Sequence, residues 1–187
     1  MDAPKVGLMS SIKQGIVEAI KGTEEIATTI VDAVAHTMVS ALKGTAQVTT
    51  SAANAISDVV RGAFHAVVEV GGDIGSTTKG VVLGVLRGTK ETGGATLEMI
   101  GQLGETVIKA TAEVTGDLGT AAKQLIEGVI EGAKELGLDV TAAASAAANG
   151  AIKAASEIGS EAGQKVRHAL TGTIAGVKVV LKEPFKK

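Results

Sequence analysis

With 187 residues, 45% of them hydrophobic, and a mean hydropathy of +0.31, the chain is too apolar to be a solvated, disordered polymer. Its net charge of −2 excludes a strong electrostatic attraction to nucleic acid, and two Phe with no Tyr or Trp leave little that could stack on bases. The absence of Cys excludes disulfides and thiolate metal sites.

The sequence repeats every 22 residues. Residues 109–130 (KATAEVTGDLGTAAKQLIEGVI) define the row, and the neighbouring rows align with it without an insertion or deletion. Because a fixed period of this kind is the signature of a repeat architecture, we predict a single repeat domain over residues 1–187. Its rows are 1–20 (partial), 21–42, 43–64, 65–86, 87–108, 109–130, 131–152, 153–174 and 175–187 (partial).

The N-terminus does not carry a basic segment followed by an apolar run, so we expect no signal peptide. The densest apolar run, residues 81–86, is far too short to span a bilayer. The cellular location is left undetermined by the sequence, with the cytoplasm as the default.

Within the rows, apolar residues recur every three or four positions, as Ile26, Ile30 and Val34 do in row 21–42. This spacing predicts helix and not strand. Each row also divides into two 11-residue units, a period that keeps an apolar stripe straight or gives it a slight right-handed drift. Pro occurs only at Pro4 and Pro184, so no residue between them has to break a helix.

We therefore predict an all-α fold in which one long, nearly continuous amphipathic helix packs side by side with other helices as a straight or right-handed bundle, tube or filament. The alternative is a helical hairpin. Its candidate turns are Gly71-Gly72-Asp73, Gly93-Gly94 and Asn149-Gly150. We prefer the continuous helix because a hairpin loop would usually add residues and shift the 22-residue register.

The polar face carries a regular pattern of charge. Lys or Arg stands at the first position of most rows, and Glu stands four residues later, as in Arg87 with Glu91 and Lys109 with Glu113. The charges form either a solvated face with pairs inside one helix or pairs between neighbouring helices.

Small residues line both edges of the predicted apolar face and let another helix approach closely. The predicted helix–helix contacts on the two edges are Gly62, Gly84, Gly88, Gly128, Gly132, Gly150, Gly172 and Gly176, and Gly71, Gly75, Gly119, Gly159 and Gly163. The last position of each row is always large, and a small residue usually lies eleven positions away, which suggests knobs that fit holes on an offset partner. These apolar knobs are Leu42, Phe64, Leu86, Ile108, Ile130, Ile152 and Ile174.

No pattern of residues predicts a catalytic, cofactor-binding or metal site. His36, His65 and His168 lie on the polar side, far apart and outside any ligand motif. Neither residues 75–80 nor residues 87–90 have the spacing of a phosphate-binding loop.

The period resembles that of lipid-surface helices. Gly88-Thr89-Lys90-Glu91-Thr92-Gly93-Gly94 and Lys21-Gly22-Thr23-Glu24-Glu25-Ile26 look similar to the repeat element of the synucleins. The perilipins also use 11-residue repeats, and the exchangeable apolipoproteins use 22-residue ones. The resemblance implies an amphipathic helix that lies on lipid, with Thr on its apolar face.

The sequence thus supports two hypotheses about function. The first is a non-enzymatic structural protein whose small-residue edges and aliphatic face drive self-assembly into a homo-oligomer or filament. The alternative is a peripheral coat on a lipid surface. Neither involves a cofactor or nucleic acid, and the partner is the chain itself or a lipid surface.

Overall fold

The computed structural model describes residues 3–21, 26–44, 49–93 and 95–182, and over these residues the chain is almost entirely helical. The helices are α1 (Ala3–Ile20), α2 (Ile26–Gly44), α3 (Thr49–Glu69), α4 (Ile74–Glu91), α5 (Leu97–Glu113), α6 (Leu118–Leu136), α7 (Val140–Ile158) and α8 (Ser160–Leu170). After α8, β1 (Thr173–Ile174) pairs antiparallel with β2 (Val177–Lys178). The predicted all-α class is confirmed.

The prediction of one nearly continuous helix was wrong, because each 22-residue row contains a helix and the connection to the next one. From the end of α3 onward the connection occupies nearly the same place in each row, so it repeats with the helix and leaves the register unbroken. Two of the three candidate turns lie in such connections: Gly71-Gly72-Asp73 joins α3 to α4, and Gly93 lies between α4 and α5. Gly94, the second residue of the Gly93-Gly94 candidate, lies outside the described residues. The third candidate turn, Asn149-Gly150, lies inside α7.

The seventh residue of a row lies just past the end of helices α3 to α6. Gly71, Gly93, Thr115 and Gly137 all have positive φ, between 55° and 133°, a region that glycine enters without steric cost. After α6, the N–H of Leu138 donates to the carbonyl oxygen of Ala133 at 2.9 Å. This bond satisfies a carbonyl that the end of the helix leaves free.

Two residues later, an acidic side chain begins the next helix. The carboxylate of Asp117 accepts from the N–H of Gly119 at 2.9 Å, and that of Asp139 accepts from the N–H of Ala142 at the same distance. Such caps satisfy N–H groups that a helix start leaves unpaired. The sequence therefore closes one helix and opens the next within three residues.

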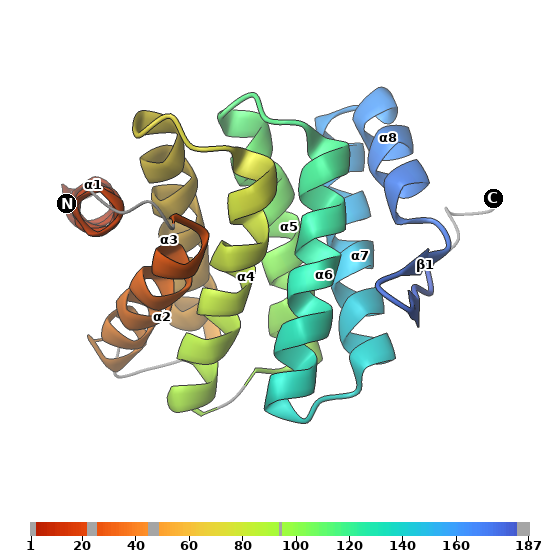
Figure 1. Cartoon of the computed structure of the whole chain (residues 1–187), viewed down its shortest axis with the longest axis horizontal. Helices are drawn as coiled ribbons and strands as arrows, with labels where there is room; N and C mark the ends of the chain where they lie inside the picture. The colour runs from red at the N-terminus through yellow and green to blue at the C-terminus, as the bar shows by residue number, and fades with distance from the viewer. Residues whose placement is uncertain (1–2, 22–25, 45–48, 94, 183–187) are drawn as a thin grey trace.

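The helices stack in two layers. Each helix packs against the next helix but one in its own layer and against its chain neighbours in the other layer. In Figure 1, α2, α4, α6 and α8 lie in front of α3, α5 and α7, and successive connections lie alternately at the two ends of the helices. Packing side by side is thus confirmed, with the chain itself supplying every partner helix that the structure contains.

A core of aliphatic side chains from all eight helices fills the space between the layers. The buried hydroxyls of Thr78, Thr89 and Thr111 donate to helix carbonyls three or four residues earlier, at 2.7 to 2.8 Å, so they add no unpaired polar group to the core. Within the described residues, no buried side-chain nitrogen or oxygen lacks a hydrogen-bond partner.

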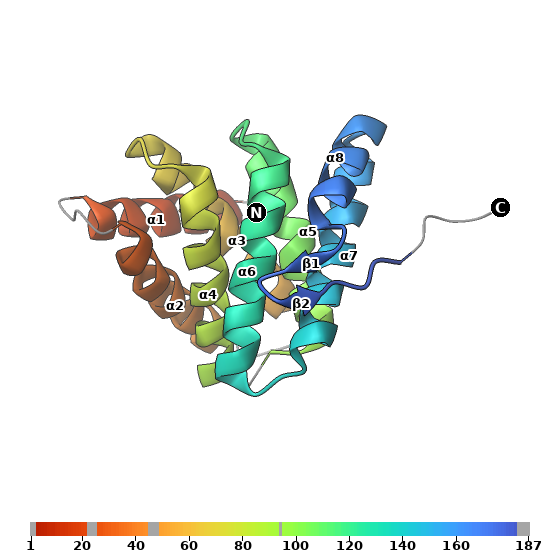
Figure 2. The ribbon, with the colours of Figure 1, turned by 45° about the vertical axis from the view of Figure 1, so that its right-hand side comes forward.

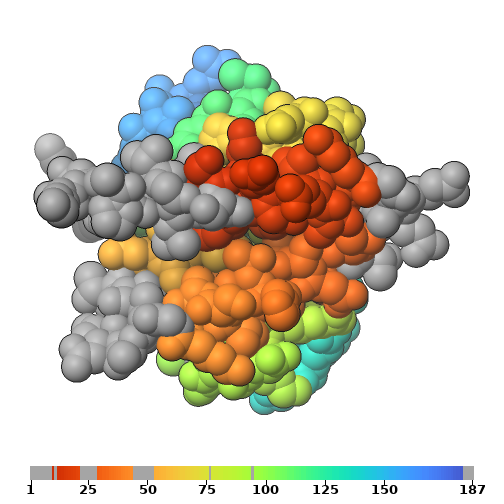
Figure 3. All heavy atoms as spheres, turned by 90° about the vertical axis from the view of Figure 1, so that its left-hand side faces the viewer, coloured from red at the N-terminus to blue at the C-terminus, as the bar shows by residue number. Residues whose placement is uncertain are grey.

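The two ends of the stack differ. Figure 3 looks at the N-terminal end, where α1 and α2 are the outermost helices. At the other end, the β1–β2 hairpin contacts α6 and α7, and the chain continues as an extended segment beyond it (Figure 2). The C-terminal end of the stack is therefore covered by chain that is not helical.

Candidate functional site

Most of the predicted contact glycines lie between helices of the same layer, where a side chain would collide with the neighbour. A Cβ added to Gly84 would lie 2.7 Å from the carbonyl oxygen of Val31, and one added to Gly88 would lie 2.9 Å from that of Ala35. The glycines placed in contacts this close are Gly62 (α1–α3), Gly84 and Gly88 (α2–α4), Gly75, Gly128 and Gly132 (α4–α6), Gly150 (α5–α7) and Gly163 (α7–α8). Gly119 also faces α8, but at 3.6 to 3.8 Å, which is ordinary contact.

The backbones of α5 and α7 make an especially close approach. A Cβ on Gly150 would overlap the carbonyl oxygen of Gly101 and would lie 2.9 Å from its carbonyl carbon. Gly104, which the sequence analysis missed, faces the backbone of Ala147 in the same way. The sequence did contain a sign of this approach, since five alanines of α7 face α5 and α6 with no exposed surface: Ala143, Ala144, Ala147, Ala148 and Ala151.

Four predicted contact glycines do not lie in helix contacts. Nothing lies within 4 Å of the Cβ position at Gly71, Gly159, Gly172 or Gly176. Gly71 ends α3 with φ +75°, and Gly172 and Gly176 flank β1 with φ +104° and +81°. Gly71, Gly172 and Gly176 are therefore small because the backbone turns there, and not because another helix approaches; Gly159 has an extended backbone, and nothing in the structure explains its small size.

The predicted knobs are placed mostly in the core. Phe64, Leu86, Ile108, Ile130 and Ile152 are buried, whereas Leu42 is half-buried and Ile174 lies in strand β1. The hole for Leu86 is Gly132 of α6, whose Cβ position lies 3.3 Å from Cβ of Leu86. The sequence predicted a hole formed by a small residue eleven positions away, on an offset partner chain. Leu86 packs instead on Gly132 of its own chain.

Ion pairs along the outer surface connect helices of the same layer: α1 with α3, α3 with α5, α5 with α7, α4 with α6, and α8 with the start of α6. Arg87 of α4 donates two hydrogen bonds to the carboxylate of Glu135 in α6, at 2.9 and 2.7 Å, and the two residues are 48 positions apart. Of the two interpretations of the charge pattern, pairing between neighbouring helices is the correct one here. The pairs are Lys13–Glu69, Arg61–Glu113, Lys79–Glu131, Arg87–Glu135, Lys109–Glu157, Lys153–Glu105 and Lys165–Asp117.

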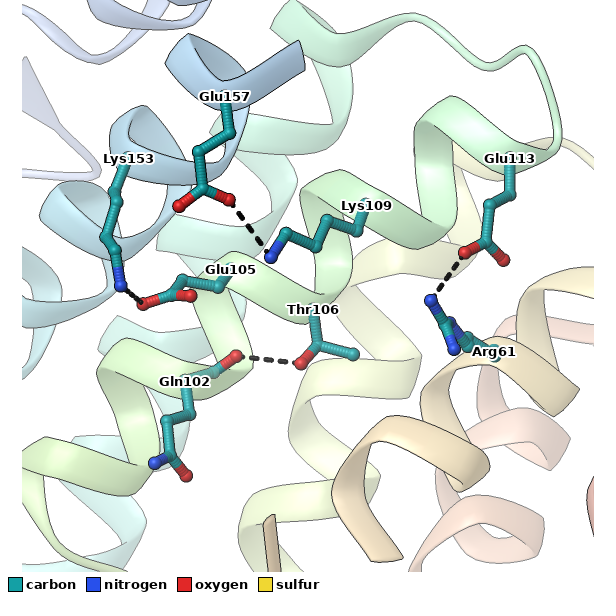
Figure 4. A network of polar contacts seen from close by, with 8 residues as sticks. All are labelled: Arg61, Gln102, Glu105, Thr106, Lys109, Glu113, Lys153 and Glu157. Carbon is teal, nitrogen blue, oxygen red and sulfur yellow. Dashed lines mark hydrogen bonds and ion pairs between the residues drawn. The ribbon is translucent and has the colours of Figure 1, made fainter. Parts of the chain in front are cut away.

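Figure 4 shows this ladder of ion pairs on one layer. Lys153 and Glu157 of α7 reach Glu105 and Lys109 of α5, at 3.0 and 3.1 Å, in two pairs of opposite polarity. Because each pair joins different helices, the ladder adds contacts between one helix and the next but one in the same layer.

The ion pairs shift the pKa values of their members. The hydrogen bond from Arg87 lowers the pKa of Glu135 below its usual 4.5, and partial burial of the carboxylate opposes this effect. Lys165 and a backbone N–H together hold the pKa of Asp117 below its usual 3.8. On the basic side, hydrogen bonds to Glu131 and Glu105 raise the pKa of Lys79 and Lys153 above 10.5.

These directions predict how stability depends on pH. A carboxylate with a lowered pKa stabilises the fold above about pH 4.5, and this stability disappears as the pH falls through the pKa of the folded state. For an exposed pair the contribution is about 0.2–1 kcal/mol. We therefore expect Arg87→Gln to lower the free energy of unfolding by roughly 0.5–1 kcal/mol near pH 7, and by almost nothing near pH 3.

The difference is measured by urea unfolding of parent and variant at low ionic strength. Lys123→Gln is the matched control, because exposed Lys123 forms no ion pair with any described residue yet carries the same charge. A loss for Arg87→Gln that is equal at both pH values, or is matched by the control, would contradict a specific contribution from the Arg87–Glu135 pair.

Among the described residues, no group of three His, Asp or Glu side chains lies close enough together to hold a metal ion. No helix within this part of the chain has both the length and the apolarity to cross a membrane. Nε2 of His65 lies 3.8 Å from the carboxylate of Glu113, beside the Arg61–Glu113 pair.

One open groove of ≈ 990 Å³ runs along the outer surface between α5 and α7. Gly101 and Gly150 form part of its lining, so the close approach of the two helices leaves a surface with few side chains there. Lys182, in the segment that follows β2, lies on its wall together with Arg167 of α8. The sequence analysis did not identify this groove, since its lining comes from three helices and the segment after β2, from Glu98 to Lys182.

No protein-family model matches the chain, and no curated protein sequence does. One solved structure similar to it is the crystal structure of a de novo designed helical repeat protein, with a TM-score of 0.49 and 20% sequence identity. The match covers 90% of this chain and 91% of the designed protein.

Proposed function

We propose that the chain is a non-enzymatic structural scaffold, a self-contained stack of helices that holds its outer surfaces in fixed positions for contact with other proteins. The observation that carries the proposal is the closure of the core within one chain: apolar side chains of all eight helices pack against each other in a single cluster. A stack in which each repeat contacts only its neighbours offers long, rigid outer surfaces.

The charged groups of the outer surface favour a structural scaffold over an enzyme. Seven ion pairs between helices join carboxylates to basic groups there, including those of Glu105 and Glu157 in the groove. Groups paired in this way stabilise the stack and are not poised to transfer protons.

Self-assembly stays a prediction, but its original argument no longer applies. The apolar faces and most of the contact glycines, which suggested association between chains, are covered by helices of the same chain. Large apolar side chains that remain exposed in the described residues are scattered: Val68, Leu97, Ile158 and Val180. A copy added to the C-terminal end would also have to displace the hairpin that packs there.

The lipid-coat hypothesis likewise stays a prediction. The aliphatic side chains that would enter a lipid surface are the ones that fill the core between the two layers. Lipid binding by these faces therefore requires the stack to open, which exposes the core to water before it reaches lipid.

Light scattering of the purified, lipid-free protein after size-exclusion chromatography tests the proposal, together with circular dichroism. We expect a monomer of 18.6 kDa with a helical spectrum that anionic vesicles leave unchanged. Oligomers or filaments of the lipid-free protein would replace the proposal with self-assembly. A disordered chain that becomes helical only with vesicles would replace it with the lipid coat.

A further inference from the structure

An extended segment of the chain lies on α7 after the hairpin. The N–H of Val180 donates to Oγ of Ser145 at 3.0 Å, and Nδ2 of Asn149 donates to the carbonyl oxygen of Val180 at 3.3 Å. The N–H of Lys182 then donates to Oδ1 of Asn149 at 2.8 Å. One side-chain amide of α7 thus holds two alternate residues of the segment through their backbone.

Helix α8 adds a contact at the end of this segment. Both Nη atoms of Arg167 donate to the carbonyl oxygen of Lys182 at 3.3 Å. Every one of these hydrogen bonds ends on a backbone atom of the segment. The contacts therefore recognise an extended main chain, whatever side chains it carries.

Side chains of the segment alternate as in a strand. Val179 is buried and Leu181 packs partly buried against the core, whereas Val180 is 57% exposed and Lys182 is exposed. Alternate residues of an extended chain point to opposite sides, so one side of the segment anchors it through aliphatic contacts. The site thus has two requirements, an extended backbone and aliphatic residues at every second position.

The position of Asn149 is explained by this contact. Asn is a poor residue for a helix interior, yet Asn149 lies in the middle of α7, four residues after Ser145. This spacing places both side chains on one face of the helix. The lining of the groove between α5 and α7 also includes Glu98 and Gln102 of α5, besides the residues that hydrogen-bond the segment.

We propose that this site on α7, formed by Ser145, Asn149 and Arg167, binds an extended segment of another protein with aliphatic residues at alternate positions, and that residues 179–182 occupy it in cis as a competitor. The proposal goes beyond the scaffold role and does not depend on it. A tethered segment has an effective concentration of about millimolar, so a free peptide gains access only when the tail is weakened or displaced.

The test uses full-length protein and a fluorescein-labelled synthetic peptide, Val-Lys-Val-Val-Leu-Lys, which copies residues 177–182. In the variant Val179→Gly/Leu181→Gly the tail loses its aliphatic anchors but the helices are unchanged. We expect fluorescence anisotropy to show that this variant binds the peptide at least tenfold more tightly than the parent does. Val180→Pro, which removes the N–H donated to Ser145, is a second tail-released variant should the first lose helicity.

Two matched comparisons separate specific recognition of the peptide from non-specific binding. In the tail-released variant, Asn149→Leu should weaken peptide binding at least tenfold, whereas Asn54→Leu on the exposed surface of α3 should leave it unchanged. N-methylation of the peptide at the residues that copy Val180 and Lys182 should weaken it to a similar degree, since it removes both backbone donors.

The proposal is overturned if neither tail-released variant binds the peptide, or if the Asn149 and N-methyl changes have no effect. It is also overturned if the parent chain exchanges its tail with a second copy to form a dimer, because the occupant is then another copy of this chain. Light scattering of the same samples detects that dimer.

Discussion

A single methyl group added at Gly150 should lower the free energy of unfolding by about 3 kcal/mol, at the upper end of the usual cost of overpacking. The new Cβ of Gly150→Ala would overlap the carbonyl oxygen of Gly101 and lie 3.3 Å from the nitrogen of Glu105. Both are backbone atoms, so relief requires α5 to move away from α7. For a domain of this size, the melting temperature should fall by roughly 6–12 °C, as measured by circular dichroism.

The matched control is Gly101→Ala, on the facing helix of the same contact. Its Cβ would lie 3.6 Å from the carbonyl oxygen of Ala146, which is ordinary contact. Alanine is better than glycine in a helix by about 1 kcal/mol, so this variant should be as stable as the parent or slightly more so. If Gly150→Ala and Gly101→Ala behaved alike, the close approach of α5 to α7 would be contradicted.

Truncation of Leu86 to Ala should cost about 2–5 kcal/mol of the free energy of unfolding, because it removes a large, almost fully buried side chain. Leu86 packs on the bare backbone of Gly132 in α6, and the Cβ position there lies 3.5 Å from its Cγ. The cavity left by Leu86→Ala therefore opens directly onto Gly132. Urea unfolding measures the loss.

The same contact predicts that the effect of Gly132→Ala depends on Leu86. In the parent the added methyl group collides with Leu86 and should cost about 1–3 kcal/mol; in Leu86→Ala it partly fills the cavity and should cost nothing or stabilise. The coupling should exceed about 1 kcal/mol. Ile16→Ala in α1, remote from Gly132, is the control, and its effect on the free energy of unfolding should add to that of Gly132→Ala. If Gly132→Ala coupled as strongly to Ile16→Ala as to Leu86→Ala, a specific contact between Leu86 and Gly132 would be contradicted.

The helical class and the identity of the buried face followed from the three-or-four spacing of apolar residues, and the structure places Ile30, Val34 and Ile56 in the core accordingly. The helix boundaries did not follow. A glycine such as Gly137 can be present because another helix approaches or because the backbone takes a positive φ, and composition does not separate the two. What distinguishes them here is Asp139, which begins the next helix two residues later.

Partners on neighbouring helices of one layer were harder to predict than boundaries. The charge pattern allowed Arg87 to pair with Glu91 in its own helix, but the structure pairs it with Glu135. The choice depends on the offset between α4 and α6, which is set by contacts such as Gly132 with Leu86 and not by the row itself. Asn149 gave a misleading sign for the same reason: its partner, the backbone of residues 180–182, lies more than 30 positions away.

The use of the same row positions in both layers bears on how a chain of this kind can change its length through duplication or deletion. Arg87 and Glu135 are 48 positions apart, which is two rows and one further turn of helix. Lys109 and Glu157 in the other layer hold the same two row positions. Loss of one 22-residue row would transfer all later helices to the opposite layer, where a base at the first row position would still lie opposite an acid at the fifth. Descendants of this chain could therefore differ from it by a single helix and keep this ion pair.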